Sequence, residues 1–308
     1  MNRAVSAPAG PWQALAPRLA LALGIAAVSC GSLFIRRAQA DAPSLAIAAF
    51  RLLLATLFLL PLAWLRHRSL LRRLVVADWG WLLGSGLCLA VHFATWITSL
   101  EYTSVASSVA LVSTSPLWVA LFAWLAWREP LTPRLGAGLA LSLAGSVLIS
   151  LAEARAAISA RPFLGNVLAL TGALAVSGYW LIGRRMRRRL PLVPYVTVVY
   201  GTAAALLMAA ALLLRQRLGG FAPATYGWFL LLALLPQLLG HSSFNWALGQ
   251  LPASYVAIAT LGEPIGAAIL AYAFLGETPT RLKLLAAGMV LAGIYLALGR
   301  RSGDAARG

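Results

Sequence analysis

The sequence predicts an all-α integral membrane protein in which ten transmembrane helices form two inverted five-helix repeats around a central cavity. Hydrophobic residues make up 61% of the 308 residues and charged residues only 11%. A soluble fold of this length cannot bury so much apolar surface, so we expect lipid to be the main solvent. The first half of the chain also recurs in the second half at a constant offset of 148 residues.

The repeat is defined by residue types that chance would not keep in register. The matching pairs are Gly24/Gly172, Arg36/Arg184, Pro43/Pro191, Pro116/Pro264, Glu129/Glu277, Thr132/Thr280 and Gly145/Gly293. They delimit two repeats, residues 15–152 and 163–299, with a short polar linker around 153–161. Because each repeat holds an odd number of spans, the second repeat must be inverted in the membrane. Inverted repeats are typical of alternating-access transporters.

Ten segments contain the roughly 17 to 25 apolar residues that a helix needs to cross the hydrocarbon core. The expected spans are 17–35, 44–65, 78–99, 105–127, 134–152, 163–183, 192–214, 225–248, 254–275 and 281–299. The first span resembles a signal peptide, since Ala38-Gln39-Ala40 follows it. Arg36-Arg37 lies between the span and that site, and the segment is repeated internally at 167–185, so we expect a first membrane helix.

The distribution of basic residues predicts the orientation. Loops and tails on the side of the N-terminus carry 16 Lys and Arg residues, and the opposite side carries eight. Positively charged loops stay in the cytoplasm, so both termini are expected there, in a bacterial inner membrane. The net charge of +17 follows from these clusters, which lack interleaved aromatic residues, and nucleic acid is not an expected partner.

Little in the sequence points to a cofactor, a metal or an enzyme. Cys30 and Cys88 lie inside apolar spans and have neither metal-ligand nor disulfide spacing. The eight acidic residues are mostly single and in loops, with no acidic pair and no H-E-x-x-H motif. An enzyme and a channel are therefore minor alternatives. The expected partners are a small-molecule substrate and the lipid bilayer, with the chain a monomer or weak homodimer.

Two segments at equivalent repeat positions resemble a known family. Residues 260–277, TLGEPIGAAILAYAFLGE, are similar to the ninth-helix signature of the drug/metabolite transporter superfamily in its EamA-type ten-helix branch. Residues 114–130, TSPLWVALFAWLAWREP, resemble the fourth-helix copy, and Arg51 in AAFRLLLA matches the second helix. The resemblance covers residues 15–299 and implies a cavity lined by helices 1, 3, 4, 6, 8 and 9, with helices 5 and 10 packed together. The family includes exporters of amino acids, nucleotide-sugar carriers and permeases for many metabolites, and the chain resembles its bacterial amino-acid exporters.

Polar side chains inside spans are costly in lipid and are therefore candidates for a function. The polar residues of the third and eighth spans share helix faces and are expected to line the cavity: His92, Trp96, Ser99, Gln237, His241 and Asn245. The alternative is that each histidine only hydrogen-bonds across a helix interface. The aromatic residues Tyr179, Trp180 and Tyr255 are further cavity candidates, able to stack on a ring or a cation.

Two charges lie deep in spans and break the repeat, because Arg51 corresponds to Val199 and Glu263 to Ser115. One hypothesis is that Glu263 carries a proton that couples to transport. The other is that Glu263 anchors the hydrogen-bond ladder interrupted by Pro264. Arg51 is the obvious counter-charge in sign.

Symmetric proline and small residues suggest how the repeats move and pack. Pro116 and Pro264 suit paired hinges, although static kinks are an equal alternative. The small-residue pairs Ala140/Ala144 and Gly288/Ala292 are expected to bring the fifth and tenth helices together.

The expected function is export of small amphipathic metabolites from the cytoplasm by alternating access. An apolar, aromatic cavity with few charges disfavours phosphorylated substrates, which require inward-facing Lys or Arg. It favours amino acids with aromatic or large apolar side chains. The alternative is multidrug efflux of lipophilic cations, since an aromatic cavity also accepts those.

Overall fold

A computed structural model describes residues 11–127, 161–251 and 262–298, together with positions 133–134, 136–138, 140–142, 144–145, 148, 256 and 259–260. The regular structure of these residues is helical. The first part contains α1 (Pro11–Ser29), α2 (Gly31–Ala38), α3 (Ser44–Arg72), α4 (Val76–Tyr102), α5 (Val105–Val112) and α6 (Ser115–Trp127). The second contains α8 (Pro162–Arg187), α9 (Leu192–Leu213), α10 (Pro223–Leu232), the π-helix η1 (Ala233–His241), α11 (Ser242–Leu248), α13 (Gly262–Leu275) and α14 (Arg281–Leu298).

Among the described residues, seven helices are long and apolar enough to cross a membrane, and Gly262–Leu275 is a shorter apolar helix. The sequence places most of their bounds within a few residues, but α1 begins at Pro11, before the predicted start at 17, and α3 continues to Arg72, beyond the predicted end at 65. Three of the residues that prolong α3, Arg66, Arg68 and Arg72, are basic and exposed, so they extend the helix beyond the apolar core.

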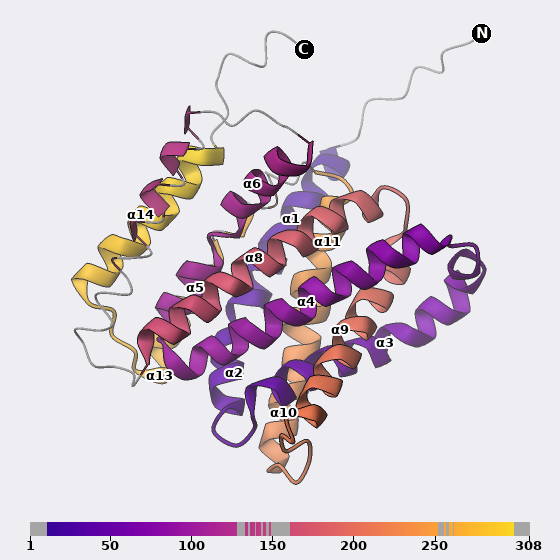
Figure 1. The fold of residues 1–308 in the computed structure, drawn as a ribbon, viewed down its shortest axis with the longest axis horizontal. Helices are drawn as coiled ribbons and strands as arrows, with labels where there is room; N and C mark the ends of the chain where they lie inside the picture. The colour runs from indigo at the N-terminus through magenta and orange to yellow at the C-terminus, as the bar shows by residue number, and fades with distance from the viewer. Residues whose placement is uncertain are drawn as a thin grey trace.

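Equivalent prolines start equivalent helices. Pro43 precedes α3 with φ −64° and ψ 149°, and Pro191 precedes α9 with φ −56° and ψ 161°. A proline has a fixed φ and no N–H, and an extended residue at this position does not need one. The two helices that begin in this way, α3 and α9, pack against each other along their length (Figure 1).

The interior lies where α3, α4, α8 and α9 meet, and α4 and α8 run side by side across the bundle (Figure 1). Large side chains there are fully buried, including Phe93, Tyr179, Tyr195 and Tyr200. The phenol groups of these tyrosines have hydrogen-bond partners: Tyr195 bonds Ser85 at 2.9 Å and Tyr200 bonds Ser242 at 3.2 Å. Buried tyrosines therefore fill the core without leaving polar groups unsatisfied.

α14 packs on the helical residues between 133 and 148 through backbone-to-backbone approach. A Cβ on Gly145 would lie 2.8 Å from the carbonyl oxygen of Ala286, and a Cβ on Gly293 would lie 2.6 Å from that of Gly138. Ser142 donates to the carbonyl of Val290, 148 positions away, at 3.1 Å. Glycine is required at both positions because the opposing atoms belong to the backbone.

The predicted small-residue pairs do not make this contact. Ala140, Ala144, Gly288 and Ala292 are exposed, and a Cβ on Gly288 would meet nothing within 4 Å. The prediction therefore selected the wrong face of each helix. The motif requires only two small residues four positions apart, so it does not specify which face makes the contact. The contacting face instead follows Gly138, Ser142 and Gly145.

The two ends of the bundle differ in their polar contacts. At the end that contains Asp41, which we call the Asp41 end, the Asp41 carboxylate pairs with Arg217 at 2.6 Å and accepts from Ala222 N at 2.8 Å and Thr225 Oγ1 at 2.9 Å. At the opposite end, the Asp78 end, Asp78 pairs with Arg189 at 3.5 Å. The Asp41 contacts join the α2–α3 connection to the segment before α10.

Acid should weaken the Asp41 contacts. The Ala222 N–H, and then Arg217 and Thr225, lower the pKa of Asp41 below its ordinary value. A lowered folded-state pKa gives stability that is complete above the unfolded value of about 3.9 and is lost as the pH falls through the folded value. We expect the unfolding temperature of the wild type to fall more steeply with acid than that of Asp41→Asn. Thermal unfolding in detergent from pH 7 to pH 3 tests this, and identical acid dependence in both proteins would contradict it.

Candidate functional site

A central cavity of about 40 Å³ lies between α4, α5, α8, η1 and the start of α13. Its lining residues are His92, Trp96, Val112, Ser113, Ser115, Val176, Trp180, His241, Phe244, Thr260 and Glu263. Four of the residues that the sequence singles out, His92, Trp96, Trp180 and His241, thus meet at one place, together with Glu263. Sequence reasoning did not select Val112, Val176 or Phe244, which look like ordinary apolar residues of a span.

Stacked rings form the walls. Trp180 and His241 are nearly parallel, with ring centroids 6.3 Å apart and an interplanar angle of 9°. His92 and Trp96 are also stacked, at 5.6 Å and 13°. His92 Nδ1 lies 2.9 Å from the carbonyl oxygen of Gly172, which fixes its ring. The cavity therefore presents flat aromatic surfaces, which suit an apolar or aromatic group on a ligand.

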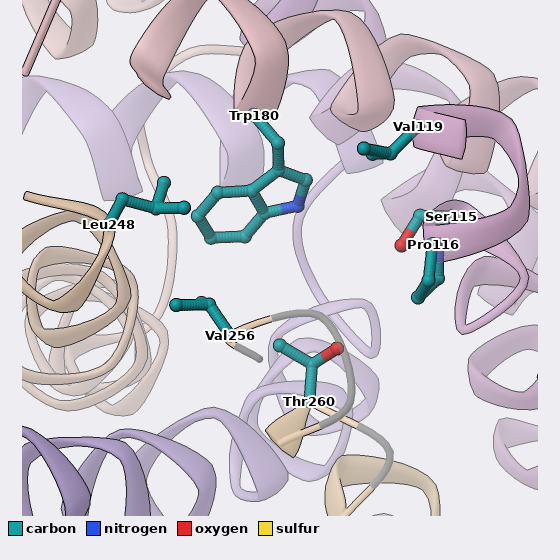
Figure 2. Close-up of a pocket in the computed structure, with 7 residues that line it drawn as sticks. All are labelled: Ser115, Pro116, Val119, Trp180, Leu248, Val256 and Thr260. Carbon is teal, nitrogen blue, oxygen red and sulfur yellow. The ribbon is translucent and has the colours of Figure 1, made fainter. Parts of the chain in front are cut away.

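A narrower pocket continues from the central cavity toward the Asp78 end. It is lined by Ser115, Pro116, Val119, Trp180, Leu248, Val256 and Thr260. Figure 2 shows the Trp180 indole projecting between Leu248 on one side and Ser115 with Pro116 on the other. Trp180, Ser115 and Thr260 line both spaces, so the pocket and the central cavity are adjacent.

Both repeat prolines lie just after helix interruptions. α5 ends at Val112, and Pro116 is the second residue of α6. Pro264 is the third residue of α13, which begins at Gly262. An i to i−3 bond closes a turn at each site: Leu117 N to Thr114 O at 2.9 Å, in a turn that includes Pro116, and Glu263 N to Thr260 O at 3.0 Å, in the turn just before Pro264. A proline in the first turn of a helix loses no hydrogen bond, so each begins a new segment.

The eighth predicted span contains a feature that the sequence does not reveal, the nine-residue π-helix Ala233–His241. It includes Pro236, which lacks a backbone donor, and such wide turns often occur at functional sites. Gln237 and His241 lie within it and Asn245 follows in α11. All three are buried, but of these only His241 lines the cavity.

The other residues singled out in the sequence lie behind the cavity wall or outside the described part. Asn245 donates to the Tyr179 hydroxyl at 2.5 Å and to the His241 carbonyl at 2.7 Å. Ser99 bonds the Trp96 carbonyl at 2.6 Å and Ser108 at 2.7 Å. Tyr179, Ser99 and Asn245 therefore support the residues that face the cavity. Tyr255 lies outside the described residues.

The two charges inside the bundle do not form an ion pair with each other. Arg51 is fully buried, donates from Nε to Gln237 Oε1 at 2.8 Å, and lies with its Cζ 4.2 Å from the centre of the Phe93 ring. Glu263 lines the cavity and acts on Arg51 electrostatically. Within the part of the chain that the structure describes, the Glu263 carboxylate accepts no hydrogen bond, so no anchoring of the Pro264 ladder is seen there.

At the Asp41 end, an ion pair joins segments that are distant in the sequence. Arg36 Nη2 lies 3.2 Å from Glu277 Oε1, and Glu277 Oε2 accepts from Val105 N at 3.0 Å at the start of α5. Beside this pair is a second cavity of about 280 Å³ between α5, α13 and α14. Its charged groups already have partners, Glu277 with Arg36 and Lys283 with Ser104. The central cavity is therefore the better candidate for a transport site, although it is the smaller of the two.

Apolar helices around an aromatic cavity define a multi-pass helical membrane protein of the transporter class. Among the described residues, no group of three His, Cys, Asp or Glu side chains could hold a metal ion. The EamA-like transporter family matches the chain over residues 17–151 and 163–299. The chain therefore belongs to the EamA-like transporters of the drug/metabolite transporter superfamily.

Curated relatives extend over most of the chain. An "uncharacterized transporter" of Archaeoglobus fulgidus is 26% identical over 287 residues, which are 90% of this chain and 96% of that protein. The "uncharacterized transporter YwfM" of Bacillus subtilis is 25% identical, over 84% of this chain and 86% of its own length. A solved structure described only as "Crystal structure of protein" has a TM-score of 0.64 at 20% identity, covering 92% of this chain and 96% of that one, and so shares its fold.

Proposed function

We propose that this transporter exports amino acids with aromatic or large apolar side chains by alternating access. The observation that carries the proposal is the composition of the central cavity, where two stacked pairs of rings meet one carboxylate, Glu263. An apolar side chain would lie against Trp96, Trp180 and the two histidines, and Glu263 would attract the ammonium group.

Ten spans in two inverted repeats are part of this proposal, and reciprocal contacts support them. A Cβ on Gly24 would meet Ser243 and Phe244, and a Cβ on Gly172 would meet Thr95 and Trp96. The two contacts are related by the repeat, because the members of each pair lie 148 positions apart: Gly24 and Gly172, Thr95 and Ser243, and Trp96 and Phe244. Reciprocity of this kind is the mark of a twofold axis.

The Gly145 and Gly293 contacts obey the same relation. Gly145 approaches Ala286, and Gly293 approaches Gly138. Gly145 and Gly293 are 148 positions apart, as are Gly138 and Ala286. With five spans in each half, a twofold axis must lie in the membrane plane, because an odd number of spans places the second half upside down.

The proposed orientation places both termini and the Asp78 end in the cytoplasm of a bacterial cell, and the Asp41 end outside its inner membrane. Basic residues gather at the Asp78 end, including Arg72, Arg73, Arg188 and Arg189. The pocket beside Trp180 leads toward that end, while the Arg36–Glu277 pair closes the opposite one. On this basis we propose a conformation that receives substrate from the cytoplasm.

Efflux of lipophilic cations is the second candidate, favoured by the same Trp180 face and Glu263 carboxylate. Purified protein in liposomes separates the two. We expect efflux of radiolabelled phenylalanine or tryptophan and little movement of a cationic dye such as ethidium. Movement of the dye without either amino acid would reject the amino-acid proposal in favour of drug efflux.

Glu263 is proposed to carry the coupling proton. A carboxylate that lines a cavity inside the membrane and lacks a hydrogen-bonded partner is suited to binding and releasing a proton. We expect Glu263→Gln to reduce phenylalanine accumulation driven by a pH gradient to the level measured without a gradient, while exchange between equal phenylalanine pools continues with a raised KM, because Glu263 also faces the ammonium group.

Glu101→Gln is the matched control, because Glu101 is an exposed carboxylate at the end of α4, away from the cavity. It should retain the response to the pH gradient. Normal gradient-driven transport by Glu263→Gln would exclude proton coupling through this residue.

A further inference from the structure

The buried interior of the protein contains a cluster of polar atoms that lack partners. Six of the eight buried side-chain atoms without a hydrogen bond in the described residues come from five neighbouring side chains: Arg51 Nη1 and Nη2, Trp96 Nε1, Gln237 Nε2, His241 Nδ1 and Asn245 Oδ1. All five side chains are more than nine-tenths buried. Buried polar groups in native proteins are nearly always paired, so a cluster of them requires an explanation.

Contacts join four of these side chains, Arg51, Gln237, His241 and Trp96, into one site. Arg51 binds Gln237 at 2.8 Å and lies 4.2 Å from the Phe93 ring centre. The Phe93 ring is 5.4 Å from the His241 ring and 6.1 Å from the Trp96 ring. His241 and Trp96 line the central cavity. The free guanidinium nitrogens therefore lie directly behind the aromatic wall.

The cluster is rich in donors and carries a positive charge. Arg51 and the Gln237 amide nitrogen only donate, as does the Trp96 indole, and Asn245 Oδ1 is the one obligate acceptor. No carboxylate lies within 4.0 Å of Arg51 in the described part of the chain, although Glu263 and the two histidines act on it electrostatically. An unpaired guanidinium inside a membrane is costly, and an anionic ligand would satisfy it.

We infer that Arg51, through Nη1 and Nη2, is the binding site for a carboxylate group of the transported molecule. The two terminal nitrogens form a planar fork that matches the two oxygens of a carboxylate. A phosphate carries more charge and more acceptors than this single cation can balance. The inference deepens the amino-acid proposal and rests on it, because Arg51, behind the aromatic wall, would hold the α-carboxylate while Glu263, which lines the cavity, would face the ammonium group.

Ligand-induced stabilisation of the purified protein tests the inference with three related probes. L-phenylalanine carries both charges, 3-phenylpropionate keeps only the carboxylate, and phenethylamine keeps only the ammonium. We expect the wild type to bind phenylalanine at least about tenfold more tightly than phenethylamine, since a hydrogen-bonded charge commonly contributes that much. Equal binding of the two would overturn the inference and leave amino-acid transport standing.

Arg51→Gln should remove the discrimination, so that phenylalanine and phenethylamine bind within about twofold of each other by the loss of that same interaction. The variant without ligand should be at least as stable as the wild type, because it no longer buries an unpaired charge. A purely structural Arg51 would instead lower the unfolding temperature and leave the preference intact in the fraction that folds. Arg66→Gln, an exposed arginine of the same helix, is the matched control and should behave as the wild type.

Three further outcomes distinguish the protein's own carboxylate from that of a ligand, and the carboxylate inference from the amino-acid proposal. If Glu263→Gln abolishes the carboxylate preference as Arg51→Gln does, the cluster holds the protein's own carboxylate and the inference fails. If phenylalanine does not bind, but 3-phenylpropionate stabilises the wild type and not Arg51→Gln, the carboxylate site stands and the amino-acid proposal fails. If no carboxylate stabilises the wild type, the inference is rejected.

Discussion

Replacing Gly293 with leucine is expected to push α14 away from the helical residues 133–148 and to destabilise the protein by about 3 kcal/mol or more. A Cβ at this position would lie 2.6 Å from the Gly138 carbonyl oxygen and 2.8 Å from the Ser142 nitrogen. Both are backbone atoms, so no side-chain rotation relieves the clash. The hydrogen bond from Ser142 to Val290 would break at the same time.

Gly288→Leu is the matched control for this prediction. Gly288 lies in the same helix, five residues before Gly293, and a Cβ there would meet nothing within 4 Å. Both substitutions have the same helix-propensity effect, so the difference between their unfolding temperatures isolates packing. Equal destabilisation by the two would show that α14 is not held by close backbone approach at Gly293.

Hydropathy was sufficient to place the seven long apolar helices of the described residues, because it depends only on residue types along the chain. The register of helix packing was harder to obtain. Small residues at 140, 144, 288 and 292 satisfy the expected motif but face outward, whereas the contacts at Gly145 and Gly293 obey the repeat. The repeat itself was therefore the better guide to packing than the motif.

The candidate site was predictable where a residue type alone signals burial of a polar group. His92, Trp96, Trp180 and His241 were selected for that reason, and they meet at the central cavity. The relation between Arg51 and Glu263 was not predictable, because opposite sign says nothing about distance. Arg51 hydrogen-bonds Gln237, which lies in the π-helix Ala233–His241. No sequence pattern in this chain predicts a π-helix at that position.

Glu277→Ala is expected to open the Asp41 end of the protein. The Glu277 carboxylate bonds both Arg36 and the first N–H of α5, and so joins the end of α13 to α2 and α5. The ion pair is partly exposed, with 30% and 22% of the two side chains accessible, and contributes about 1 kcal/mol after screening. The bond to Val105 N adds about 1 kcal/mol, and the sum shifts an opening equilibrium by roughly tenfold or more.

Accessibility of a single cysteine measures this opening. In a Cys30→Ala, Cys88→Ala background, Val112→Cys places the reporter on the central cavity at the end of α5. A membrane-impermeant thiol reagent added from the outside should label it roughly tenfold faster in Glu277→Ala. Arg36→Gln should have the smaller effect, because it removes the ion pair and leaves the bond to α5.

Arg184→Gln is the informative comparison, since Arg184 is the repeat equivalent of Arg36 and forms no ion pair with the residues that the structure describes. It should not increase labelling from the outside. The charge-reversed double variant Arg36→Glu with Glu277→Arg should return the labelling rate toward the wild type, because it recreates the pair with opposite polarity. Unchanged labelling in Glu277→Ala would mean that this pair stabilises a loop and does not hold the outer end closed, and the closure would then rest on the apolar contacts of α5 with α13.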